Sequence, residues 1–180
     1  MIPVEWNNKS TIDQYKISGL IPIGLCPGAE YGPAKRWPID RFRKVMDLLL
    51  PFPIVWVLLG TAQERALSVP LMENFPGLVE NLIGTTSLDE LMRTIKGLDL
   101  LLTNDTGSMH LAALFNIPTV ALFGSTDPNL TGPQGSIHRV LRHPVECSPC
   151  FLRTCPIDFR CMIRITPEEV VHAITETISK

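Results

Sequence analysis

Residues 98–115 carry the sequence LDLLLTNDTGSMHLAALF, which predicts a buried strand, a tight turn and the beginning of a helix. The apolar run at 98–102 leads into a turn that contains Asp105 and Gly107, and a second apolar run at 109–115 leads out. Such a junction directs free backbone N–H groups and the positive end of a helix dipole at one point, where phosphate usually binds. Asp105 would repel phosphate and fits better as an acceptor for sugar hydroxyls beside it. The residues therefore indicate a nucleotide-sugar site.

The rest of the chain alternates short apolar runs with amphipathic segments. The apolar runs are continuous rather than alternating, which is typical of strands that are buried on both faces. Strands that alternate with helices predict a Rossmann-like α/β fold, a parallel sheet flanked by helices, with ligands at the carboxyl ends of the strands. The expected strands are 21–26, 54–59, 78–83, 98–102, 118–123 and 139–142, and the expected helices are 39–50, 61–75 (bent or broken at Pro70), 87–96, 108–115 and 166–178.

The length of 180 residues allows one ordinary domain with a full core. Residues 1–20 are expected to form a polar lead-in or interdomain segment, and residues 21–180 the binding domain. Hydrophobic residues make up 45% of the chain and charged residues 19%, which argues against disorder. The net charge of −2 gives no bulk attraction to nucleic acid. Because no apolar run reaches the roughly 20 residues of a membrane span and the polar start lacks a signal-peptide pattern, we expect a cytoplasmic protein without a transmembrane segment.

Residues 27–38, PGAEYGPAKRWP, follow the first strand and form a loop rich in glycine and proline. Glycines allow the backbone to approach a ligand closely, and Lys35 supplies a point charge suited to phosphate. The alternative is a surface loop with two solvated bases, and the spacing alone leaves both interpretations open. This loop, the turn after Leu59 and the turn after Thr103 all follow parallel strands, so they can converge on one crevice.

The candidate binding residues around the Asp105 turn can also be explained by purely structural parts. Asp105 or Thr106 can simply cap the helix that follows, by accepting hydrogen bonds from its first N–H groups. His110 lies about one turn into that helix, where a lone histidine is more often an ordinary packed or exposed side chain than a ligand-binding one. A lysine-bearing loop at the same edge of the sheet favours the functional interpretation of all three residues.

Two more loops at this edge hold polar candidates. Glu64, which follows a strand and Gly60, can accept hydrogen bonds from both hydroxyls of a ribose, or it can favour a helix start through its charge alone. In the loop after the 118–123 strand, Thr126 or a backbone N–H can contact phosphate, but an Asp-Pro turn at 127–128 is the simpler interpretation.

A cysteine-bearing loop at 147–161 is the last candidate site. Its spacing is C-x2-C, then x4-C, then x5-C, and four thiolates so close in sequence can hold a tetrahedral structural metal. Reduced thiols are the alternative, and disulfides fit a cytoplasmic protein less well. Cys26 stands apart and is expected to be a buried strand residue. The candidate metal ligands are Cys147, Cys150, Cys155 and Cys161.

Three motifs resemble, in order and spacing, those of the bacterial ADP-heptose:lipopolysaccharide heptosyltransferases, glycosyltransferase family 9. They are PGAEYGPAKRWP at 27–38, NDTGSMHLAA at 104–113 and LFGSTDP at 122–128, and the PAKRWP wording is closer to heptosyltransferase II than to heptosyltransferase I. The cysteine-bearing loop also resembles one found in many relatives. The resemblance implies a GT-B enzyme with two Rossmann-like domains facing across a cleft, of which this chain is similar to the carboxyl-terminal, donor-binding half.

The resemblance also implies the parts played by individual residues in binding the donor. The implied set is Lys35 at the ADP diphosphate, the backbone of Thr106 and Gly107 at the same phosphates, Asp105 with support from His110 at the heptose hydroxyls, Glu64 at ribose, and Thr86 in the Thr85–Thr86 turn at adenine.

The implied reaction is an inverting transfer of heptose from ADP-heptose to the lipopolysaccharide inner core, with no cofactor required. The catalytic base is a carboxylate of the amino-terminal half, so we expect no catalytic residue in this chain and no transfer by it alone. The acceptor would be reached through that other half, at the inner face of the bacterial inner membrane. Two alternatives stay open: a non-catalytic nucleotide-binding or assembly module that kept the fold, and an interaction site held by a metal at the cysteine loop.

Overall fold

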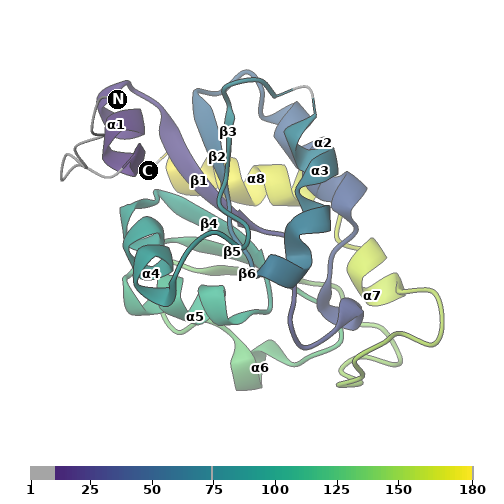
Figure 1. Ribbon diagram of the computed structural model, residues 1–180. Helices are drawn as coiled ribbons and strands as arrows, with labels where there is room; N and C mark the ends of the chain where they lie inside the picture. The colour runs from purple at the N-terminus through teal and green to yellow at the C-terminus, as the bar shows by residue number, and fades with distance from the viewer. Residues whose placement is uncertain (1–10, 74, 180) are drawn as a thin grey trace.

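A computed structural model describes residues 11–73 and 75–179 of the chain. One six-stranded sheet, entirely parallel, forms the centre of the molecule, in the order β3-β2-β1-β4-β5-β6 (Figure 1). The order reverses between β1 and β4, and ligands of such sheets bind outside the carboxyl ends of the strands at that point. The strands are β1 (Ile21–Cys26), β2 (Ile54–Leu58), β3 (Val79–Asn81), β4 (Leu100–Asn104), β5 (Thr119–Phe123) and β6 (Arg139–Arg142).

Helices cover both faces of the sheet and complete a three-layer α/β domain (Figure 1). Helices α1, α4 and α5 pack on one face, and α2, α3, α7 and α8 pack on the other. The helices are α1 (Thr11–Ile17), α2 (Ile39–Leu48), α3 (Val69–Met72), α4 (Leu88–Gly97), α5 (Gly107–Leu114), α6 (Pro128–Thr131), α7 (Arg160–Ile163) and α8 (Pro167–Ile178), with 3-10 turns η1 (Pro33–Lys35) and η2 (Ala62–Leu67).

The central strands bury both of their faces, as the continuous apolar runs predict. In β1, Ile23 and Leu25 point into the cluster under α2 and α8, while Cys26 joins the cluster under α4 and α5. Every residue of β2, β4 and β5 is buried. The prediction of a Rossmann-like parallel sheet with helices on each side is therefore confirmed.

Two capping boxes mark helix starts where the sequence predicts them. Ser87 Oγ accepts a hydrogen bond from Glu90 N at 3.3 Å, and Glu90 Oε2 accepts one from Ser87 N at 2.8 Å, at the start of α4. Thr166 and Glu169 form the same reciprocal pair at the start of α8. Each box satisfies N–H groups that the first turn leaves free, which stabilises a helix by about 1 kcal/mol.

Two segments differ from the expected elements. Residues 61–73 form the 3-10 turn η2 and the short helix α3, so the expected helix is broken rather than bent. Pro70 lies in the first turn of α3, where its missing N–H has no consequence. In the expected lead-in, residues 11–17 form helix α1, whose Ile12 is buried against Gly97 of α4. Residues 1–10 of that segment lie outside the described residues, and the division of the chain at residue 20 stays a prediction.

Candidate functional site

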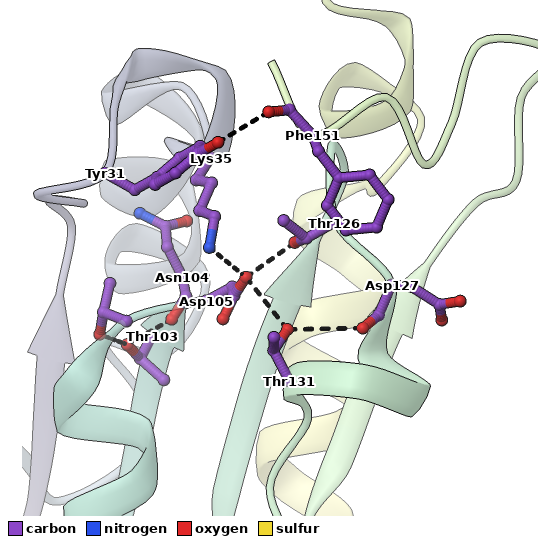
Figure 2. Close-up of polar contacts among 10 residues, drawn as sticks. Tyr31, Lys35, Thr103, Asn104, Asp105, Thr126, Asp127, Thr131 and Phe151 are labelled. Atoms are coloured by element: carbon purple, nitrogen blue, oxygen red, sulfur yellow. Dashed lines mark hydrogen bonds and ion pairs between the residues drawn. The ribbon is translucent and has the colours of Figure 1, made fainter. Parts of the chain in front are cut away.

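An ion pair joins the glycine-rich loop to the turn after β4. Lys35 Nζ lies 2.6 Å from Asp105 Oδ2, and only 12% of the lysine side chain and 5% of the aspartate side chain are exposed (Figure 2). η1 carries Lys35 beyond the end of β1, and Asp105 directly follows β4, so the two residues face each other where the strand order reverses. The alternative of a loop with solvated bases does not hold for Lys35.

The carboxylate of Asp105 also collects hydroxyl groups from the loop after β5. Thr126 Oγ1 donates to Asp105 Oδ2 at 2.7 Å, and Thr131 Oγ1 lies 3.5 Å from the same oxygen (Figure 2). Asp127 between them caps α6 by accepting a hydrogen bond from Asn129 N. The Asp-Pro turn is thus present, and a contact of Thr126 with phosphate stays a prediction. One carboxylate oxygen ties together the loops that follow three adjacent strands, β1, β4 and β5.

Asn104, the last residue of β4, fixes the glycine-rich loop at both of its ends. Its Nδ2 donates to the carbonyl oxygens of Pro27 and Gly28 at 2.9 and 3.1 Å, and its Oδ1 accepts from Trp37 N at 3.1 Å. The side chain is fully buried, so each of these bonds replaces one to water. Sequence reasoning did not single out this residue, although it stands next to Asp105 in the quoted motif.

The start of α5 lies open beside this network. Thr106 is the N-cap residue, but its hydroxyl contacts Thr103 Oγ1 at 3.1 Å and does not cap the helix. A Cβ placed on exposed Gly107 would meet no atom within 4 Å. Because Asp105 is engaged with Lys35, the interpretation of this turn as a simple side-chain cap is wrong, and the helix start faces open space.

Glu64 reaches the same edge of the sheet from the loop after β2. Its Oε2 accepts hydrogen bonds from Thr61 N at 2.8 Å and from Thr61 Oγ1 at 3.1 Å, which closes the capping box of η2. The side chain is 7% exposed, and a Cβ on Gly28 would lie 1.9 Å from Oε1. Glu64 therefore stands at a helix start, held there by hydrogen bonds, and its carboxylate also lies directly against the glycine-rich loop. Its contact with ribose stays a prediction.

Two further candidates lie outside the hydrogen-bonded network of Figure 2. Thr86 is half-buried in the connection between β3 and α4, and His110 is exposed on the first turns of α5. Their parts in binding stay predictions. Cys26, by contrast, is a buried strand residue as predicted. Burial raises the pKa of its thiol to about 12, and the charge of Glu64 adds to this effect. Hydrogen bonds with Ser108 and Thr103 act in the opposite direction.

The four clustered cysteines share one small cavity. They line a cavity of about 60 Å³ together with Ala34 and Ser125, and burial raises the pKa of the Cys161 thiol. Within residues 11–73 and 75–179, no three histidine, cysteine, aspartate or glutamate side chains are placed to hold a metal ion. The possible structural metal at Cys147, Cys150, Cys155 and Cys161 is therefore unsupported.

Comparison with known proteins places this geometry in a family. The model of glycosyltransferase family 9 (heptosyltransferase) matches residues 4–159. The chain belongs to this family. Lipopolysaccharide heptosyltransferase 2 of Escherichia coli K12 is 36% identical over 143 residues, which cover 77% of this chain and 41% of that protein. Lipooligosaccharide heptosyltransferase 2 of Haemophilus influenzae is 33% identical over 165 residues, 88% of this chain and 47% of that protein.

Solved structures of family 9 enzymes show the same fold. The structure of E. coli ADP-heptose lps heptosyltransferase II matches with a TM-score of 0.75 at 30% identity, covering 95% of this chain and 52% of the other. An E. coli heptosyltransferase solved with ADP matches with a TM-score of 0.72 at 25% identity, covering 92% and 49%. The chain thus spans about half the length of the curated relatives it matches, which is consistent with the carboxyl-terminal half of a GT-B glycosyltransferase.

None of the helices in residues 11–73 and 75–179 has the length and apolar character that a membrane crossing requires.

Proposed function

We propose that this family 9 chain is a donor-binding half, which binds an ADP-sugar where the glycine-rich loop meets the start of α5. The observation that carries the proposal is the Lys35–Asp105 pair at the carboxyl ends of β1 and β4. A cation, a carboxylate and an open helix start stand together there, which matches a diphosphate joined to a sugar. The solved family 9 structure that contains ADP supports the choice of nucleotide.

The Lys35–Asp105 pair suggests how the ADP-sugar would bind. A diphosphate is a stronger partner for the ammonium of Lys35 than one carboxylate, because it carries more charge and more acceptor oxygens. When the ammonium turns to the diphosphate, Asp105 is released to accept hydrogen bonds from heptose hydroxyls. The backbone at Thr106 and Gly107 would hold the same phosphates, favoured by the dipole of α5.

The nucleoside would extend toward β2 and β3. Glu64 Oε2 is occupied by the capping box, so Oε1, which lies against Gly28, is the oxygen we assign to the ribose hydroxyls. Thr86 would flank adenine, and His110 would support the heptose side of the site. These assignments rest on the resemblance of the motifs and on the shared edge of the sheet.

The reaction we propose is heptose transfer to the lipopolysaccharide inner core, carried out with the other half of the enzyme. An acceptor hydroxyl loses its proton to a carboxylate of that half and attacks the anomeric carbon, while the bond from this carbon to the diphosphate breaks and ADP leaves. Lys35 and the start of α5 would stabilise the charge that develops on the leaving diphosphate. The relatives' names support the lipopolysaccharide acceptor, and with it a place at the cytoplasmic side of the membrane. By itself the chain would bind donor weakly, because half a cleft leaves the ligand exposed on one side.

Titration calorimetry with ADP and with ADP-heptose tests the proposal. We expect both ligands to bind, and Asp105→Asn to weaken ADP-heptose more than ADP, because Asp105 is assigned to the sugar. Asp89→Asn, which changes an exposed carboxylate of α4, is the matched control and should change neither affinity. The absence of heat with ADP at millimolar concentration would count against the donor site and favour an assembly module that kept the fold.

A transfer assay tests the second half of the proposal. We expect no heptose transfer from the chain alone and measurable transfer when the amino-terminal half of a matched heptosyltransferase 2 is added. Transfer by the chain alone would show that the catalytic base lies within it.

A further inference from the structure

Tyr31 stands between Lys35 and the cysteine-bearing loop. Lys35 Nζ lies 4.8 Å from the centroid of the Tyr31 ring, and the guanidinium carbon of Arg153 lies 5.1 Å from it. The Tyr31 hydroxyl donates a hydrogen bond to the carbonyl oxygen of Phe151 at 2.7 Å (Figure 2). The ring is therefore held at its hydroxyl end by the cysteine-bearing loop and offers its π system to the ammonium of Lys35.

The loop that holds Tyr31 is itself anchored to the end of β5. The backbone N–H groups of Cys150 and Phe151 both donate to the carbonyl oxygen of Ser125, at 3.0 and 2.8 Å. Two residues further on, the carbonyl oxygen of Arg153 accepts a hydrogen bond from Ala34 N at 2.9 Å. Residues 150–153 thus join β5 to the glycine-rich loop on both sides of Tyr31.

Gly32 makes this approach possible. A Cβ at Gly32 would lie 2.5 Å from the carbonyl oxygen of Arg153, so a larger residue would push residues 150–153 away from the glycine-rich loop. The contacts form a closed ring in space: Ser125 to Phe151, Phe151 to Tyr31, Tyr31 to Lys35, Lys35 to Asp105, and Asp105 to Thr126, which follows Ser125 in the chain.

We propose that Tyr31 is a positioning residue for Lys35, supported by the main chain of residues 150–153. The proposal rests on the proposed donor site. A lysine side chain has four rotatable bonds, so it loses much conformational entropy when its ammonium is held in place. While Asp105 holds the ammonium, Tyr31 covers it from a second side. Once a diphosphate draws the ammonium from Asp105, the ring of Tyr31 is the contact that keeps it at the mouth of the site.

The proposal gives the cysteine-bearing loop a part that needs no metal. Its main-chain carbonyls at 151 and 153 accept hydrogen bonds from the glycine-rich loop. A change of the cysteine side chains that leaves this main chain in place should therefore leave Lys35 in place as well.

Two variants of Tyr31 separate the ring from the hydroxyl. Tyr31→Leu removes both, and we expect about tenfold weaker ADP binding; Tyr31→Phe keeps the ring and should lose about threefold, the range for one cation–π contact and one neutral hydrogen bond. Tyr15→Phe is the matched control, because Tyr15 belongs to α1 and packs against the cluster under α4 and α5, away from the site, so its change should leave ADP binding unchanged. Adenosine, which has no phosphate, should bind all of these variants equally.

A double-mutant cycle with Lys35→Ala tests whether Tyr31 acts through Lys35. If it does, Tyr31→Leu has no further effect on ADP affinity in the Lys35→Ala background. Equal effects in both backgrounds, or an unchanged affinity in Tyr31→Leu alone, would overturn the proposal. The conservative Tyr31→Phe variant keeps the test valid if Tyr31→Leu folds poorly.

A readout without nucleotide separates this proposal from the proposed function. The side-chain ammonium of Lys35, identified by its loss in Lys35→Ala, can be followed by ¹⁵N NMR in the free protein. We expect its protons to exchange faster with water in Tyr31→Leu than in the wild type or Tyr15→Phe. Faster exchange without any ADP binding by the wild type would refute the donor site and keep the positioning role, whereas an unchanged signal would refute the positioning role.

Discussion

Lys35 and Asp105 are 70 residues apart in the chain and form an almost fully buried ion pair of 2.6 Å. Burial of two charges costs solvation free energy, which offsets much of the attraction between them. Such a pair therefore stabilises a fold less than its short distance suggests. Its position at the end of the sheet where β1 meets β4 makes a binding function the better explanation. The pair is also the point where folding stability and donor binding can be separated by mutation.

Replacement of Lys35 by methionine should reduce both stability and binding. Asp105 would then be buried without its cation, and we expect the free energy of unfolding to fall by about 3 kcal/mol. Urea denaturation measures this change. The double variant Lys35→Met with Asp105→Asn should recover most of the stability but no ADP binding. Recovered binding in that variant would show that the pair has a structural part only.

Asn104→Ala should release the glycine-rich loop. Three buried hydrogen bonds are lost, two of them from Nδ2 to carbonyl oxygens and one to Oδ1. We expect a loss of about 2–4 kcal/mol in the free energy of unfolding, from about 1 kcal/mol for each bond and the groups left unpaired. Asn129→Ala, an exposed asparagine of α6 with local contacts, is the control and should change stability by less than about 0.5 kcal/mol. Equal effects of the two variants would contradict the anchoring role.

Gly28→Ala should displace the carboxylate of Glu64. The new Cβ would lie 1.9 Å from Oε1 and 2.1 Å from Cδ, so the side chain has to move out of its capping position. We expect a destabilisation of about 1–3 kcal/mol, which thermal unfolding can measure. The effect should be smaller in a Glu64→Ala background, where the clash is absent. Additive effects of Gly28→Ala and Glu64→Ala would mean that the two residues do not share this contact.

Stability should fall at alkaline pH because of Cys26. Burial raises the pKa of the folded thiol to about 12, against 9.0 in the unfolded chain. Between these values the unfolded state loses the proton and the folded state keeps it, so the free energy of unfolding falls as pH rises. One such group contributes a slope of at most about 1.4 kcal/mol per pH unit. Cys26→Ala, measured under reducing conditions, should flatten the stability profile above pH 9, whereas Cys147→Ala, at an exposed cysteine, should not. Parallel profiles for Cys26→Ala and the wild type would contradict a neutral buried thiol.

Elements with a local physical cause could be predicted from the sequence. Continuous apolar runs indicate buried strands because both faces of a central strand exclude water, and Ser87 with Glu90 marks a helix start because the capping box lies within four residues. The segment at 61–75 was predicted less well. The chain forms η2 and α3 there, and Pro70 lies in the first turn of α3, where a proline fits because that N–H has no partner within the helix.

At the candidate site too, some features could be predicted from the sequence and others could not. Lys35 and Asp105 could be predicted to lie at one edge of the sheet, because loops that follow parallel strands share that edge. The contribution of Asn104 could not, because a buried amide at a strand end has no pattern in sequence until the loop it holds is folded onto it. For the cysteine cluster, the spacing left a shared metal and reduced thiols open. The folded loop adds that its main-chain carbonyls accept hydrogen bonds from Tyr31 and Ala34.

The sequence by itself determined the parallel sheet, the helix starts and the edge at which a phosphate-bearing ligand is expected, because periodicity and capping act over a few residues. Only the tertiary structure decided that Asp105 faces Lys35 and Thr126, that Asn104 ties down both ends of the glycine-rich loop, and that residues 150–153 support Tyr31. These contacts join segments far apart in the chain. Their existence depends on strand order and on how closely loops pack, and neither is encoded in any short stretch of residues.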